Sequence, residues 1–280
     1  MQKALKRYFA LFALPGIICF SLAFFIPMIM GVVLSFCKFT SVTNATFVGF
    51  SNYTKSFIND DFLHALVFTV KFTLISVVLI NTIAFTLAML LTKGIKGTYA
   101  FRTIFFMPNL IGGIVLGWIW QVIINGILLK RGVTIVSNPK YGFWGLVVLM
   151  NWQNVGYMMV IYIAGIQNIP KDLIEAAQID GAGKSMMLFK VILPSIMSSI
   201  TICTFLTLTN GFKLFDQNLA LTAGDPGRQT EMVALNIVNT FYGRNGFEGV
   251  GQAKAVMFTL IVSVIALTQL RLTRNKEVER

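Results

Sequence analysis

Long apolar runs separated by short polar segments dominate this chain from one end to the other. A membrane-spanning helix needs about 20 mostly apolar residues, and six runs reach that length. The expected spans are 9–37, 62–92, 103–124, 144–165, 195–214 and 252–270. The pattern therefore predicts an all-α membrane protein with six transmembrane helices in a single domain, residues 1–280.

The first apolar run follows Lys3, Lys6 and Arg7, as the core of a signal peptide would. The run is longer than a signal peptide requires, and no cleavage site of small residues follows it. We therefore expect this segment to be retained as a membrane anchor.

The composition supports a membrane protein. Hydrophobic residues make up 56% of the chain and charged residues only 12%, with a mean hydropathy of +0.74. A soluble domain carries about 25% charged residues, so this chain has too few to cover a water-facing surface. The net charge of +12 is spread among the apolar segments. This scatter favours basic residues at membrane ends over a nucleic-acid site.

The basic residues also predict an orientation. If the N-terminus lies inside, the inner segments hold 13 Lys and Arg and the outer segments hold 9. The inner residues are Lys3, Lys6, Arg7, Lys93, Lys96, Arg102, Lys171, Lys184, Lys190, Arg271, Arg274, Lys276 and Arg280. Positive charge is typical of cytoplasmic segments, so both termini and the loop 166–194 are expected in the cytoplasm.

The loop 166–194 is polar and has the features of two short helices. Asn168 is expected to cap the first helix, because Pro170 and Asp172 suit a helix start. Gly181 is expected to end that helix, and a second helix is expected from Lys184 to Val191. The two helices would form a compact knob that another protein could contact. The alternative is an ordinary cytoplasmic loop.

The chain shows no catalytic or cofactor motif. A phosphate-binding loop needs a glycine six residues before its lysine. Gly183-Lys184-Ser185 has Gln178 at that place, and no strand precedes it. The three cysteines have no metal-type spacing and are expected to be buried thiols. No acid–base constellation lies within the spans. These observations exclude a nucleotide site and a metal site, and they argue against a membrane enzyme.

Polar side chains within the fourth and fifth spans are candidates for a substrate path. They are Trp152, Gln153, Asn154, Tyr157, Thr207, Asn210 and Gly211. Amides and an aromatic ring suit a sugar, whose hydroxyl groups need hydrogen bonds and whose C–H face can stack. The alternative is that these amides join neighbouring helices. Lys71, in the second span, is expected to reach the interface rather than line a pore, and Gly113-x3-Gly117 is expected to be a packing face.

Several motifs resemble those of a known family. Glu175-Ala176-Ala177-x3-Gly181, continuing to Leu193-Pro194, resembles the signature loop of ABC importer permeases, with Val191 where the pattern has Ile. Four further segments resemble sugar permeases of the MalF/UgpA-like branch: Phe47–Tyr53, Phe101–Pro108, Ile161–Pro170 and Phe215–Glu231. Asp225 departs from the usual glycine in the last segment.

The resemblance implies the type I ABC importer permease fold in a bacterial or archaeal cell membrane. It implies a second permease, two ATPase subunits that bind ATP and Mg, and an extracellular solute-binding protein that delivers a carbohydrate. The residues that would couple this chain to the ATPase are Glu175, Ala176, Ala177, Asp180, Gly181 and Ala182. In the maltose branch of the family, substrate contacts come from the fourth and fifth spans. The positions that align with them here are Trp152, Gln153, Asn154, Tyr157, Thr207, Gly211 and Leu214.

Two other functions remain open. A related permease could carry a peptide or polyol, although the sugar-branch motifs argue against a peptide. A secondary transporter would carry intramembrane charges and two related halves. This chain shows no convincing internal repeat, and Lys71 is its only deep charge.

Overall fold

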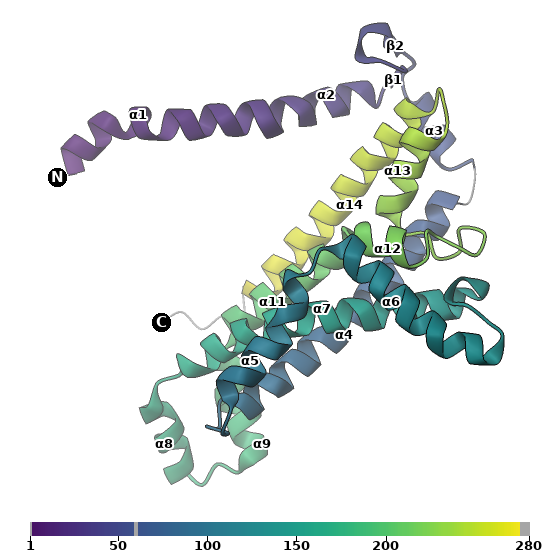
Figure 1. Cartoon of the computed structure of the whole chain (residues 1–280). Helices are drawn as coiled ribbons and strands as arrows, with labels where there is room; N and C mark the ends of the chain where they lie inside the picture. The colour runs from purple at the N-terminus through teal and green to yellow at the C-terminus, as the bar shows by residue number, and fades with distance from the viewer. Residues whose placement is uncertain (1, 59–60, 275–280) are drawn as a thin grey trace. The chain divides into compact units, whose positions relative to one another are not determined.

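A computed structural model describes residues 2–58 and 61–274, and these residues are mostly helical (Figure 1). Lys276 and Arg280, which contribute to the expected orientation, lie outside the described residues. The first expected span is a continuous helical stretch made of α1 (Gln2–Phe20), a π-helical turn (Ser21–Phe25) and α2 (Ile26–Leu34).

A short extended hairpin and a short helix follow the first span. Strand β1 (Cys37–Lys38) pairs antiparallel with β2 (Thr46–Phe47), with Cys37 opposite Phe47. Helix α3 (Ser51–Ser56) comes next.

The rest of the chain is a series of helices. They are α4 (Asp61–Leu91), α5 (Thr98–Phe106), α6 (Gly113–Leu128), α7 (Pro139–Gln167), α8 (Lys171–Ile179), α9 (Lys184–Met186), α10 (Leu193–Ser195), α11 (Met197–Phe212), α12 (Asp216–Leu221), α13 (Val233–Gly243) and α14 (Glu248–Arg274). Single 3₁₀ turns lie at Val42–Asn44, Met107–Leu110, Leu129–Arg131 and Ile135–Ser137, and a π-helical turn lies at Met187–Ile192.

The described residues divide into two compact units. The first is drawn from Met1–Phe62 and Ile237–Leu260, and the second from Leu63–Asn236 and Ile261–Arg280. The second unit contains the chain from α5 to α12, which includes all the residues expected to couple to an ATPase or to line a path.

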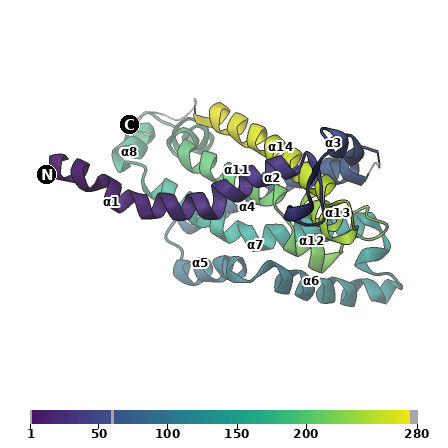
Figure 2. The same cartoon turned by 90° about the horizontal axis from the view of Figure 1, so that it is seen from above.

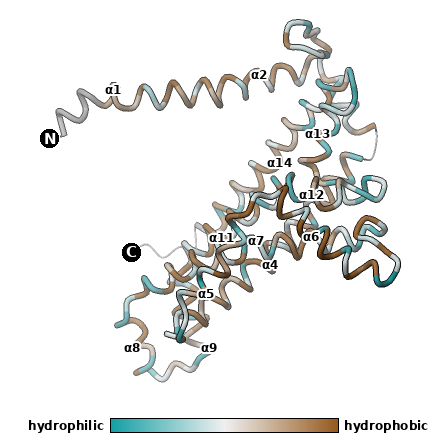
Figure 3. Tube along the Cα trace, viewed as in Figure 1, coloured by the Kyte–Doolittle hydropathy of each residue, from teal (hydrophilic) through white to brown (hydrophobic). Residues whose placement is uncertain are grey.

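The number of long apolar helices agrees with the predicted six spans. Within residues 2–58 and 61–274, five helices are long and apolar enough to cross a membrane. The number reaches six when Lys184–Ser195 and Met197–Phe212, which meet at an angle of 71°, are counted as one bent span. Pro194 lies just before this bend and cannot donate the backbone hydrogen bond of a regular helix. Figure 3 shows the apolar colour along α6 and polar colour around α8.

The prediction of one continuous third span over 103–124 is wrong. Helix α5 and the 3₁₀ turn after it end at Leu110, the backbone is extended at Ile111 and Gly112, and α6 starts at Gly113. The apolar candidate span is Gly113–Arg131. Pro108 has no backbone N–H and so removes a helical hydrogen bond. A hydropathy pattern does not reveal such a break, because the residues on both sides of it are apolar.

Glycines allow α6 to pack closely on α12, as Figures 1 and 2 show. A Cβ atom built on Gly117 would lie 2.7 Å from the Cβ of Ala220, and one built on Gly113 would lie 2.7 Å from the Cβ of Asp216. These contacts confirm the prediction that Gly113-x3-Gly117 is a packing face.

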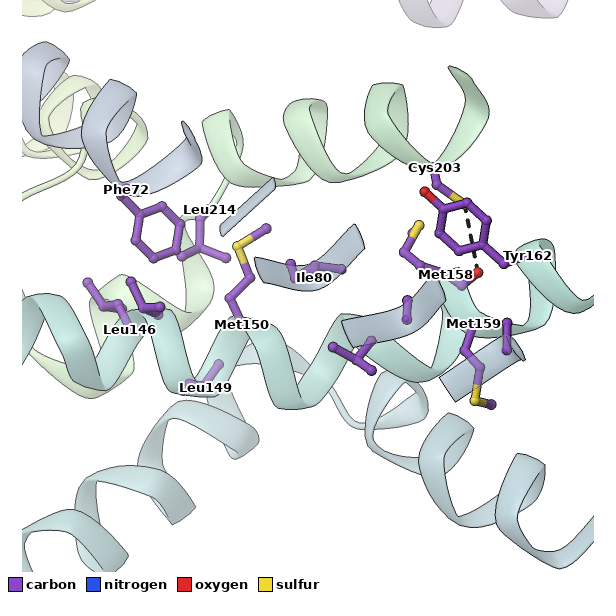
Figure 4. Packing of buried hydrophobic residues seen from close by; sticks show 14 of the residues in the cluster. Phe72, Ile80, Leu146, Leu149, Met150, Met158, Met159, Tyr162, Cys203 and Leu214 are labelled. Carbon is purple, nitrogen blue, oxygen red and sulfur yellow. Dashed lines mark hydrogen bonds between the residues drawn. The ribbon is translucent and has the colours of Figure 1, made fainter. Parts of the chain in front are cut away.

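Helix α7 is the centre of the second unit. In its most apolar window 72% of the residues are buried, compared with 11% for the span that begins at Gly113. Leu146, Met150 and Met158 lie fully buried in one hydrophobic cluster with side chains from α4 and α11 (Figure 4). The residues that α7 presents to its neighbours are therefore held in fixed positions.

Two residues differ from the sequence interpretation. Cys37 and Cys203 are buried as expected, but Cys19 is exposed, so the prediction for Cys19 is wrong. Lys254 is one of the nine basic residues assigned to the outer segments, but it lies inside α14 and is buried. Its Nζ donates to the hydroxyl of Thr240 at 2.9 Å, which offsets part of the cost of burying a cation.

Candidate functional site

The coupling loop, defined here as residues 166–194, begins differently from the sequence prediction. The prediction that Asn168 caps the loop helix is wrong, because Asn168 ends α7 and its N–H donates to the carbonyl oxygen of Ala164 at 3.2 Å. Helix α8 starts at Lys171 after Pro170, whose backbone is extended. Proline disfavours a helical conformation in the residue before it, so the chain leaves α7 before it enters α8.

Gly181 ends α8 as predicted. Its φ of +77° is a left-handed conformation that glycine adopts at little cost. The N–H of Ala182 donates to the carbonyl oxygen of Ala177 at 2.9 Å, and the N–H of Gly181 donates to that of Gln178 at 3.1 Å. This pair of bonds is the Schellman motif that closes many helices, so the turn out of α8 has a defined geometry.

Helix α8 is attached on one side and exposed on the other. Ile174 is half-buried and packs on the hydrophobic cluster around α7. Glu175, Ala176, Asp180 and Gly181 are exposed, whereas Ala177 and Ala182 are half-buried. Ile179 is 85% exposed. An exposed surface of small, apolar and acidic residues is suited to contact with another protein.

A groove of about 760 Å³ separates α8 from the chain that follows it. Leu173, Ala176 and Ala177 line it on the α8 side, and Val191, Pro194 and Met197 line it on the other. The second expected helix is present, starting at Lys184 and leading through the bend at Ile196 into α11. The groove therefore lies between the exposed helix and a membrane span.

A smaller pocket contains the side-chain amides of α7 and α11. This amide pocket, about 330 Å³ in volume, is lined by Asn109, Gln153, Asn154, Asn210, Lys213, Leu214 and Gln217. Its volume lies near the lower end of the range that ligand pockets occupy. Amides both donate and accept hydrogen bonds, and Lys213 adds a cation, whereas the lining includes no carboxylate.

Hydrogen bonds hold the amides of this pocket in place. Nε2 of Gln217 donates to Oε1 of Gln153 at 2.8 Å, and Nε2 of Gln153 donates to the carbonyl oxygen of Ile111 at 3.2 Å. Nδ2 of Asn210 lies 3.4 Å from Oδ1 of Asn154. The bond to Ile111 satisfies a carbonyl in the break before α6, so Gln153 joins that break to α12.

The other expected path residues lie away from the pocket lining. The Trp152 ring packs 5.6 Å from that of Trp120, and the Tyr157 ring packs 6.3 Å from that of Phe106, measured between ring centroids. The hydroxyl of Thr207 accepts a hydrogen bond from Asn81 at 3.0 Å. Thr207 is therefore part of a contact between α4 and α11.

Gly211 also lies at the contact between α4 and α11. A Cβ atom built on it would lie 2.8 Å from two side-chain atoms of Thr73. The expected path residues thus divide into three that line the amide pocket, namely Gln153, Asn154 and Asn210, and four that contact neighbouring helices.

Sequence reasoning missed Asn109, Lys213 and Gln217. Asn109 directly follows the motif that ends at Pro108, and Gln217 directly follows Phe215-Asp216. Asn109 and Gln217 could therefore have been found from the sequence as polar side chains next to recognised motifs. Within residues 2–58 and 61–274, no group of three His, Cys, Asp or Glu side chains is placed to hold a metal ion.

The loop between α12 and α13 is organised by Asn218. Its Oδ1 accepts from the N–H of Met232 at 2.9 Å, and its Nδ2 donates to the carbonyl oxygen of Thr230 at 2.8 Å. Asn218 is fully buried. A buried amide with both ends satisfied fixes the loop, including Asp225 at the position where the sugar-branch motif has glycine.

Comparisons with known proteins identify the family and the fold. Residues 80–275 match the model of the family described as "Binding-protein-dependent transport system inner membrane component". One relative is named "Probable starch degradation products transport system permease protein AmyD", from Thermoanaerobacterium thermosulfurigenes. It is 41% identical over 280 residues, which cover 97% of this chain and 96% of the relative.

Two further comparisons cover nearly the whole chain. The arabinooligosaccharides transport system permease protein AraP of Halalkalibacterium halodurans is 33% identical, covering 92% of this chain and 85% of AraP. Among solved structures, a chain of a bacterial ABC transporter for the import of alginate matches with a TM-score of 0.81 at 21% identity, covering 98% of each chain. That structural match confirms the type I permease fold.

Proposed function

This chain belongs to the family of binding-protein-dependent transport system inner membrane components, and we propose that it forms half of the membrane path of an ATP-driven carbohydrate importer. In this proposal a second permease supplies the other half. The observation that carries the substrate class is the amide pocket, which joins three predicted path residues with Asn109, Lys213 and Gln217. Relatives named for starch degradation products and arabino-oligosaccharides support the same class.

The amide pocket suits a hydroxyl-rich solute. Each sugar hydroxyl donates one hydrogen bond and accepts others, and side-chain amides match both roles. The bonds between Gln153 and Gln217 and between Asn154 and Asn210 keep these groups oriented before a substrate arrives. Such preorganisation lowers the entropy cost of binding.

Two ATPase subunits would bind ATP and Mg and would contact the coupling loop. The exposed residues Glu175, Ala176, Asp180 and Gly181, with half-buried Ala177 and Ala182, would form the contact. An acidic and small-residue surface beside a groove favours a basic or apolar element of the ATPase. This chain itself would not hydrolyse ATP.

The bent span offers a route for transmitting that contact. Residues Lys184–Ser195 connect α8 to α11 through a bend of 71°, and α11 carries Asn210 of the amide pocket. Movement of α8 by the ATPase would therefore tilt a helix that lines the path. This is coupling of two sites through one movable element.

The coupling loop is expected to face the cytoplasm, and the loop after α13 is expected to face outward. Single cysteines at Ser185 and Asn245, both exposed, test this in a variant lacking Cys19, Cys37 and Cys203. An impermeant thiol reagent applied to intact cells should label only the cysteine at position 245. Labelling of position 185 from outside would reverse the proposed orientation.

Asn210→Leu is expected to reduce uptake about five- to thirtyfold, since loss of one polar contact costs about 1–2 kcal/mol. The ATPase should still co-purify, because Asn210 lines the amide pocket and is not among the exposed residues of the coupling loop. Thr209→Val is the matched control, because the Thr209 hydroxyl donates only within its own helix, at 2.9 Å to Phe205. Poor assembly of the Asn210 variant would instead make this amide a helix contact and leave the pocket without support.

A further inference from the structure

The segment Ser35–Ile58, called here the outer segment, carries exposed aromatic side chains that the proposed function does not use. It connects the end of the first span, Phe12–Leu34, to the second span, which begins at Asp61. Both of its ends are therefore tied to membrane spans. Phe47 is 78% exposed and Phe50 is 71% exposed.

The motif Phe47–Tyr53 divides into residues that hold the fold and residues that do not. Nδ2 of Asn52 donates to the carbonyl oxygens of Ser35 at 2.9 Å and Cys37 at 2.8 Å. The hydroxyl groups of Tyr53 and Ser35 are 2.6 Å apart. These bonds join α3 to the chain just after α2. The Phe47 side chain, in contrast, is exposed.

The exposed rings belong to a firmly held surface rather than a loose loop. The Phe50 ring lies 5.3 Å from that of Phe36 and 5.8 Å from that of Tyr53. The hairpin fixes Phe47 opposite Cys37. Ile58, 73% exposed, extends the apolar surface towards the start of α4.

The charge of the outer segment is entirely basic. From Ser35 to Ile58 the chain contains Lys38 and Lys55 and no Asp or Glu, and both lysines are exposed. Exposed aromatic rings beside cations are the pattern of surfaces that lie at a membrane–water interface. The cations attract anionic headgroups while the rings enter the acyl boundary.

We propose that the outer segment is a membrane-interface anchor, with Phe47 and Phe50 inserted between the headgroups of the outer leaflet and with Lys38 and Lys55 on anionic lipid. The covalent connections favour lipid over a protein partner, because the segment starts directly after Leu34 and ends within a few residues of Asp61. It would hold the ends of the first two spans at a fixed depth.

The test measures the depth of side chains in the assembled importer. Nitroxide labels are placed on single cysteines at Phe47, Phe50 and Thr43, the last being the control because it lies in the polar turn Val42–Asn44. The complex is reconstituted in vesicles of phosphatidylethanolamine and phosphatidylglycerol. Collision rates are measured with oxygen, which concentrates in hydrocarbon, and with a water-soluble nickel complex.

Labels at positions 47 and 50 are expected to collide severalfold more with oxygen than with nickel, and the label at 43 to show the reverse. Equal nickel access at all three positions overturns the anchor. Shielding of positions 47 and 50 from both reagents, or shielding that appears only when the solute-binding protein is added, also overturns it and identifies a protein contact. Measurement at two aromatic positions keeps the test decisive when one variant fails to assemble.

Discussion

Gly181→Leu is expected to abolish ATP-coupled uptake while the subunit still reaches the membrane. Gly181 has a φ of +77° and completes the Schellman motif that ends α8. A side chain in this conformation costs about 1–2 kcal/mol, which the exposed loop avoids by unwinding the end of α8. The surface formed by Glu175 and Asp180 would then lose its shape. Uptake and co-purification of the ATPase are the two measurements.

Two variants separate the effect of backbone conformation from that of added bulk. Gly183→Leu places the same side chain two residues away, where φ is −68° and a Cβ atom meets nothing within 4 Å, and it should retain uptake. Gly181→Asn should retain part of the activity, because Asn tolerates the left-handed region. Normal uptake by Gly181→Leu would show that the end of α8 has no part in coupling.

Gly156→Ala is expected to lower the amount of folded subunit several-fold. A Cβ atom at this position would overlap the carbonyl oxygen of Phe105 in α5. Overpacking costs about 1–3 kcal/mol, and here the obstacle is backbone, so α5 and α7 must separate. Thermal unfolding of the purified protein, followed by fluorescence size-exclusion, measures the loss.

Gly126→Ala is the control for this prediction. Gly126 lies in α6 with open space around it, and alanine favours a helix over glycine by about 1 kcal/mol. The control should therefore equal the unchanged protein or exceed it slightly. If Gly156→Ala proves as stable as Gly126→Ala, the close approach of α5 and α7 is not a feature of the folded protein.

The periodic features of the fold were predictable from the sequence. Spanning helices follow from the length of apolar runs, since a bilayer leaves few other structures possible. The end of α8 at Gly181 was also predictable, because glycine readily adopts the left-handed conformation that ends many helices. Features with a local cause were therefore identified correctly.

Features that depend on distant contacts were not predictable. The break before α6 is stabilised by Gln153, which is 42 residues away in the chain from Ile111. Gln217 enters the amide pocket only because α12 packs on α6. Asn168 was assigned to α8 because its side chain suits a cap, but the bonds that close α7 engage its backbone N–H instead.

Uptake by the reconstituted complex tests the central claim most directly. The chain is purified with its partner permease and ATPase, placed in vesicles, and supplied with the solute-binding protein and labelled maltotriose or arabinotriose. We expect accumulation of at least one of these sugars that requires both ATP and the binding protein and that is lost in the Gly181→Leu variant. Uptake that continues without ATP, or that follows an imposed proton gradient, would contradict the account.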